Sequence, residues 1–115
     1  MSNHDKKILQ KIIEHSDHIL NYVSMCNGIE DFSSNDMIVE ACVFNIMQIG
    51  ELAHTELSDE VKNNNQAIPW KQIYGMRNRI VHGYSDVSMD VVWETAKKDI
   101  IVLKKELEDI LNKNA

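Results

Sequence analysis

The chain has 115 residues, of which 43% are hydrophobic and 26% are charged. These values are close to the averages for soluble globular proteins, so they exclude a disordered chain and predict one domain over residues 1–115. One proline, four glycines and 6% aromatic residues are too few turn and strand formers for an all-β fold.

The N-terminal residues are charged and lack the apolar core of a signal peptide, and no apolar run approaches the roughly 20 residues that span a bilayer. The two cysteines, Cys26 and Cys42, have no metal-ligand spacing and are too few for a disulfide framework. We therefore expect a cytoplasmic protein in which both cysteines are small buried hydrophobic residues.

The net charge of −6 argues, taken alone, against a nucleic-acid partner. The charge is unevenly distributed, however, because no acidic residue lies between Glu60 and Asp86. That segment holds the cations Lys62, Lys71, Arg77 and Arg79. The sequence thus places a basic segment on an acidic body.

The first predicted helix spans residues 3–26, where apolar residues recur at steps of three and four and form one stripe that faces a core. The stripe consists of Leu9, Ile12, Ile13, Ser16, Ile19, Leu20 and Val23. Asn27 and Gly28 are expected to end this helix, with the glycine in the left-handed conformation.

The second predicted helix spans residues 35–57 and is apolar on nearly every side. Ser33, Ser34 or Asn35 can supply the oxygen that caps its N-terminus. A helix that is apolar all round needs cover on every face. It is therefore either the central helix of the fold or a helix that also packs against a second copy of the chain.

Ser58 can open a short turn before a polar loop over residues 63–66. Pro69 suits the first turn of a third helix that is expected from Trp70 to His82. Ser88 can cap a fourth helix with a seam at Trp93, Ala96, Ile100, Leu103, Leu107 and Ile110. The expected fold is all-α, an up-and-down bundle of four to five helices.

Five polar side chains able to donate hydrogen bonds gather at the end of the third helix, in IPWKQIYGMRNRIVHGYSDV at residues 68–87. They are Arg77, Asn78, Arg79, His82 and Tyr84. Asn78 lies one turn before His82 and can orient its ring. Arg77 and His82 are about 140° apart around the helix axis and about 7.5 Å apart along it, so they flank a site rather than touch.

An arginine that grips phosphate oxygens beside a histidine that moves a proton is suited to phosphodiester cleavage. In RNA the 2′-hydroxyl can attack the phosphate, so neither a metal nor a protein nucleophile is required. Two proton transfers are needed, and one histidine supplies one of them at a time. A symmetric dimer would bring two copies of Arg77 and His82 to one cleft.

Structural interpretations stand beside these functional ones. The polar cluster can simply cap carbonyl groups and form surface ion pairs. Glu51 can hold Arg77 or be a solvated carboxylate. Trp70, Tyr74 and Trp93 can stack on bases or belong to the core. His4, His15, His18 and His54 show no convincing metal-ligand pattern, and exposed positions explain His15 and His18 as well.

Residues 68–87 resemble the motif of the HEPN superfamily, in particular the HepT-like toxins. The family pattern is an arginine, a polar residue, three further positions, a histidine, one residue and a tyrosine, and it stands here from Arg77 to Tyr84 without departure. IGELA at residues 49–53 and SMDVVWETAKKDI at residues 88–100 also resemble the family. The resemblance extends over about residues 38–111.

The resemblance implies a homodimeric, metal-independent RNase that uses no cofactor, with Arg77 and His82 catalytic. From the residues themselves, Asn78 is expected to position His82, and Glu51 and Arg79 can support the site. It further implies that a minimal nucleotidyltransferase, the cognate antitoxin, attaches AMP to Tyr84 and so silences the toxin. A phosphate-bearing adduct beside His82 would place negative charge where the RNA phosphate must bind.

A non-catalytic adaptor is the alternative. In that interpretation the helical dimer binds a nucleotide or a substrate for a partner nucleotidyltransferase, and the acidic net charge favours this over RNA binding.

Overall fold

A computed structural model describes residues 1–114, in which every regular element is helical. The long helices are α1 (Asn3–Ser24), α3 (Asp36–Thr55), α5 (Trp70–Val81) and α7 (Ile100–Lys113), with α6 (Met89–Glu94) leading into α7. Between α6 and α7 lies a π-helical segment, Thr95–Asp99, called here the π segment. The short elements are α2 (Ile29–Ser33), α4 (Asp59–Asn63) and a 3-10 turn, Tyr84–Asp86.

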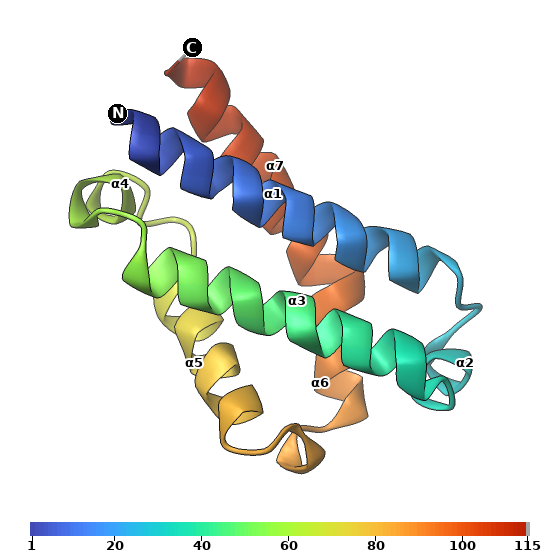
Figure 1. Ribbon diagram of the computed structural model, residues 1–115. Helices are drawn as coiled ribbons and strands as arrows, with labels where there is room; N and C mark the ends of the chain where they lie inside the picture. Colours follow the sequence, from blue (N-terminus) through green and yellow to red (C-terminus); the bar gives the residue numbers. More distant parts are fainter. Residues whose placement is uncertain (115) are drawn as a thin grey trace.

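The helices pack as a bundle around α3 (Figure 1). Helix α1 contacts both α3 and α7, and α5 lies against α3. The two ends of the described chain lie at the same end of the bundle, while α2 lies at the other end and contacts α6. The arrangement confirms the predicted all-helical fold.

Side-chain caps fix where the helices begin. The Asn35 side chain accepts from the N–H of Ile38 at the start of α3, and Ser58 and Ser88 cap α4 and α6 in the same way. Each cap satisfies a backbone donor that the first helical turn leaves without a partner. The three caps expected at these positions are confirmed.

The predicted end of the first helix is wrong. Helix α1 ends at Ser24, and Gly28 has φ 167°, which is extended backbone rather than the left-handed conformation. The chain runs on into α2, whose Phe32 is fully buried against Trp93 of α6. The glycine therefore precedes a short helix that tertiary packing holds, and local sequence gave no sign of that helix.

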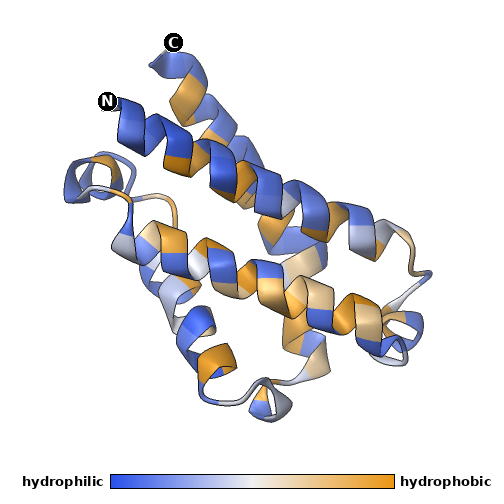
Figure 2. Cartoon of the chain, viewed as in Figure 1, coloured by the Kyte–Doolittle hydropathy of each residue, from blue (hydrophilic) through white to orange (hydrophobic). Residues whose placement is uncertain are grey.

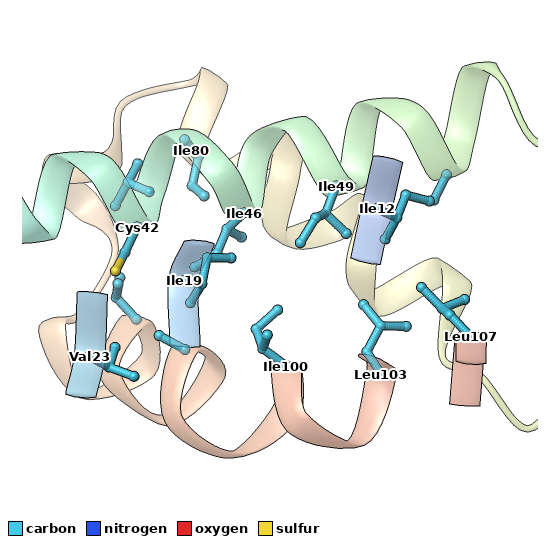
Figure 3. Close-up of a cluster of buried hydrophobic side chains, with 14 of the residues drawn as sticks. Ile12, Ile19, Val23, Cys42, Ile46, Ile49, Ile80, Ile100, Leu103 and Leu107 are labelled. Carbon is cyan, nitrogen blue, oxygen red and sulfur yellow. The ribbon is translucent and has the colours of Figure 1, made fainter. Parts of the chain in front are cut away.

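The core lies between α1, α3, α5 and α7 (Figure 3). The predicted seam through α6 and α7 is confirmed, since all six of its side chains are buried. Cys42 lies in this core, and burial raises the pKa of its thiol to about 12. Cys26 is also buried, so both cysteines are packing residues, as expected.

Helix α3 is apolar along most of its length (Figure 2), but the chain does not cover it on every side. Its packed face meets α1 and α5. On its other face Met37 is 81% exposed and Phe44 is 52% exposed. The single chain therefore leaves apolar α3 surface open to solvent. Within residues 1–114, no helix combines the length and apolar character needed to cross a membrane.

Candidate functional site

The polar cluster lies at the C-terminal end of α5. The helix ends at Val81, one residue earlier than predicted, and His82 is its C-cap, with its backbone N–H donated to the carbonyl of Asn78. Gly83 follows with φ 128°, a conformation that side chains disfavour, and among residues 1–114 it is the only glycine with φ between +20° and +160°. This turn separates His82 on the helix end from Tyr84 in the 3-10 turn.

A close approach of α3 and α5 positions Arg77. Gly50 of α3 faces α5, and a Cβ atom on it would overlap Arg77 Cβ and lie 3.1 Å from the carbonyl oxygen of Ile73. The absence of a side chain at Gly50 is what lets the two helices come this near. Glu51, the next residue, then comes within reach of the guanidinium.

The Arg77 guanidinium is held at three nitrogen atoms. Its Nε donates to Glu51 Oε2 at 2.8 Å, Nη2 forms an ion pair with the same oxygen at 2.7 Å, and Nη1 donates to Asn78 Oδ1 at 2.9 Å. Each terminal nitrogen keeps a second N–H that these contacts do not use. The side chain, 26% exposed, can therefore still bind an anion in a fixed orientation.

Asn78 contacts Arg77 rather than the ring of His82. Asn78 was expected to orient that ring, but its oxygen accepts from Arg77, and no side chain among residues 1–114 forms a hydrogen bond with the imidazole. The exposed ring borders a hollow of about 270 Å³ that Asn78, Arg79, Gly83 and Asp86 also line. We call this the His82 hollow.

Tyr84 turns away from this hollow, toward α3. Its side chain is partly open to solvent, and its hydroxyl lies 3.5 Å from Glu40 Oε1, to which it can donate. The phenol is thus accessible and stands near the exposed α3 surface that carries Phe44.

An aromatic stack beside Arg77 was missed by sequence reasoning. The rings of His54 and Tyr74 lie parallel, with centroids 3.5 Å apart and planes 10° apart, and the Arg77 guanidinium carbon is 5.7 Å from the Tyr74 centroid. Tyr74 precedes Arg77 by three residues, and His54 follows Glu51 by three. The stack therefore lies one helical turn away from the Glu51–Arg77 pair in each helix and forms a second contact between α3 and α5.

The other singled-out rings have structural roles. Trp93 is buried in the core, and Trp70, partly buried, donates its indole N–H to the carbonyl of Asn65. His15 is half-buried rather than exposed, and its Nδ1 lies 2.8 Å from Asn45 Oδ1. Of the residues expected to support the site, the structure brings Glu51 to Arg77, whereas Arg79 lies on the other side of α5, in the His82 hollow.

The fold and the motif define an all-helical domain with an arginine and a histidine at the two ends of one short helical stretch. Comparison with known sequences agrees with this description. A family model described as "Ribonuclease HepT-like" matches residues 9–110. The chain therefore belongs to the HepT-like ribonuclease family.

Several curated relatives resemble the chain over nearly its whole length. A protein named "Putative RNase" from Methanocaldococcus jannaschii is 36% identical over 92% of this chain and 86% of its own. Another of that name, from Caldanaerobacter subterraneus subsp. tengcongensis, is 32% identical over 91% of this chain and 92% of its own. A protein named "Probable ribonuclease HepT" from Thermococcus cleftensis is 30% identical over 84% and 94%. No solved structure matches significantly.

Proposed function

We propose that this protein is a metal-independent ribonuclease that acts as a homodimer, the toxin of a pair whose antitoxin is a nucleotidyltransferase. The observation that carries the proposal is the set of contacts that the Arg77 and His82 side chains make and leave free. The guanidinium is fixed by Glu51 and Asn78 yet keeps free N–H groups, and the imidazole is exposed and makes no side-chain hydrogen bond within residues 1–114.

Arg77 binds and neutralises the scissile phosphate in this reaction. The 2′-oxygen forms a bond to phosphorus, and the bond from phosphorus to the 5′-oxygen breaks. A neutral His82 takes the proton of the 2′-hydroxyl, and a protonated His82 gives a proton to the leaving 5′-oxygen. The products are a 2′,3′-cyclic phosphate and a 5′-hydroxyl, so no water or metal-bound nucleophile enters the step.

The two proton transfers require two imidazoles, and the exposed side of α3 supports a dimer that supplies both. Met37, Glu40, Phe44, Gln48 and Glu51 follow one another at steps of three and four, so they share one helical face, called here the α3 face. Glu51 links this face to Arg77. A twofold contact through the α3 face would place the two Arg77 side chains near one interface.

Tyr84 is the residue on which the antitoxin would place AMP. Its side chain is accessible, and within residues 1–114 its hydroxyl has only the long hydrogen bond to Glu40. An attached nucleoside monophosphate would add negative charge and bulk beside the α3 face, next to the interface at which Arg77 has to bind the RNA phosphate.

Glu51, Asn78 and Arg79 support the two catalytic residues. Glu51 and Asn78 position Arg77, because their oxygens accept from its nitrogens. Arg79, which has no side-chain partner among residues 1–114, is free to contact a neighbouring phosphate from the His82 hollow.

Cleavage of RNA by the purified protein in EDTA tests the proposal. We expect wild type to cut RNA and His82→Ala to lose cleavage by about 100-fold or more, since general acid–base catalysis contributes at least that much. Tyr84→Phe should still cut RNA but accept no AMP from the nucleotidyltransferase, read as the missing mass increase of one or more AMP groups.

The matched control is His18→Ala, because His18 is exposed on α1 and has no contact with the cluster. Full cleavage by the His82→Ala protein would contradict the assignment. The acidic net charge favours the adaptor alternative. Intact RNA with every variant, together with tight binding of the nucleotidyltransferase, would support that alternative instead.

A further inference from the structure

A second cavity lies between α5 and the unit formed by α6, the π segment and α7, with Ile46 and Ile49 of α3 also lining it. It has a volume of about 650 Å³, which is within the range of small-molecule sites. Ile73 and Met76 of α5 form one wall, and Val91 and Ile100 form the opposite wall. We call it the α5–α7 cavity.

Polar groups at the rim surround this apolar interior. Gln72, Arg79 and Asp99 are exposed to solvent and Thr95 is half-buried, and none of the four side chains makes a hydrogen bond or an ion pair with residues 1–114. Thr95 and Asp99 are the two ends of the π segment. A π turn inside a helix is uncommon and frequently occurs at functional sites.

The cavity is joined to the proposed cleavage site through one residue. Arg79 lines both the α5–α7 cavity and the His82 hollow. Gly75 also lines the α5–α7 cavity and faces open space there, since a Cβ atom on it would meet no atom within 4 Å. A ligand could therefore place an anionic group at Arg79 and an apolar ring between Met76 and Ile100.

We propose that the α5–α7 cavity binds a nucleobase of the RNA strand, one nucleotide away from the phosphate that is cut. This inference rests on the proposed ribonuclease function and adds a base-recognition site to it. A nucleobase has apolar faces and a polar edge, and single-stranded RNA is commonly recognised through bases that splay out of the strand. Arg79 would bind the phosphate that joins this nucleotide to the cleavage site.

Asp99 sets the base preference. An ionised carboxylate only accepts hydrogen bonds, so it favours an edge with adjacent N–H donors and opposes an edge with carbonyl oxygens. Guanine offers a ring N–H next to an amino group, which fits the carboxylate best. Uracil offers one N–H between two carbonyl oxygens and fits worst.

The test uses short RNAs that differ only in the base one nucleotide away from the cleaved bond, cut by the full-length protein. We expect wild type to cut the guanine substrate about tenfold faster than the uracil substrate, and Asp99→Asn to remove that difference. Asp109→Asn changes an exposed carboxylate on α7 that lies outside the cavity, and should keep the wild-type preference.

A binding measurement separates this inference from the proposed function. NMR of the His82→Ala protein with guanosine 5′-monophosphate should shift the backbone amides of Thr95 and Ile100, and uridine 5′-monophosphate should shift them less. If wild type cuts no RNA, the proposed function fails, but these shifts would still support nucleobase binding in the cavity. Two results would overturn the inference. One is RNA cleavage that shows no base preference, or a preference that Asp99→Asn does not change; the other is the absence of shifts at the amides of Thr95 and Ile100.

Discussion

At the scale of single residues, the orientation of Arg77 depends on a missing side chain. Gly50 lets α3 and α5 approach until Arg77 Cβ occupies the space where a Cβ of residue 50 would lie. The ion pair with Glu51 then forms at 2.7 Å. Because the pair is partly exposed, it contributes less to stability than to the direction in which the guanidinium points.

A pair of glycine substitutions tests this close approach. Gly50→Ala should lower the free energy of unfolding by about 1–3 kcal/mol, because the new methyl group overpacks a contact with backbone and Cβ atoms. Gly75→Ala adds the same methyl group in α5 where no atom lies within 4 Å, and should raise the free energy of unfolding by up to about 1 kcal/mol. Urea unfolding of both variants measures the difference, and equal stabilities would contradict the helix contact described here.

At the scale of elements, Asp5 joins the start of α1 to the start of α4. Its Oδ1 accepts from the Ser58 backbone N–H at 3.0 Å and its Oδ2 from the Ser58 hydroxyl at 2.8 Å. Burial by itself raises the pKa of Asp5, but the hydrogen bonds from Ser58 and Ser2 outweigh it, so the pKa lies below its ordinary value of 3.8.

We predict that Asp5→Ala lowers the free energy of unfolding at pH 7 by about 1–3 kcal/mol, because Ser58 loses both acceptors. The lowered pKa means that the native state binds this proton more weakly than the unfolded state does. The carboxylate thus stabilises the fold fully above pH 3.8 and loses this contribution as pH falls through its lower native value. Urea titrations from pH 7 to pH 3 should show the gap between wild type and variant narrowing.

Glu14→Ala serves as the control, since Glu14 is exposed on the same helix. Its effect should stay within about 0.5 kcal/mol. A gap between wild type and Asp5→Ala that widens toward low pH would show that the assigned hydrogen bonds do not control the titration of Asp5.

Local patterns were sufficient for the elements that depend on nearby residues. The caps at Asn35, Ser58 and Ser88 and the seam of α6 and α7 were all predictable. Helix α2 and the π segment were not predictable, because packing against distant helices holds them. The same limit applies to the site, since the motif named Arg77 and His82 but could not show that Asn78 bonds to Arg77.

At the scale of the whole molecule, two exposed apolar surfaces differ in their relation to the site. The α3 face carries Met37 and Phe44 and is continuous with Glu51 and Arg77. The other surface, with Ile101 and Val102, lies on α7. The proposed dimer uses the first surface, because that surface, unlike the one on α7, is continuous with Glu51 and Arg77.

Phe44→Asp should therefore convert the protein to a monomer, as measured by sedimentation velocity. It should also abolish RNA cleavage, because each cut needs one imidazole from each of the two subunits. Val102→Asp places the same charge on α7 at a residue that is 59% exposed, slightly more than Phe44. That variant should remain dimeric and active. A dimer that survives Phe44→Asp, or one that Val102→Asp dissociates, would place the interface elsewhere.

The turn at Gly83 has a consequence for access. Two neighbours in the motif, His82 and Tyr84, open onto different surroundings: the imidazole borders a small concavity, whereas the phenol stands beside Glu40. A modifying enzyme can therefore reach the phenol without inserting any part of itself beside the imidazole. The accessibility of His82 and the accessibility of Tyr84 are therefore separate properties. A bulky reagent could label Tyr84 and leave His82 unmodified.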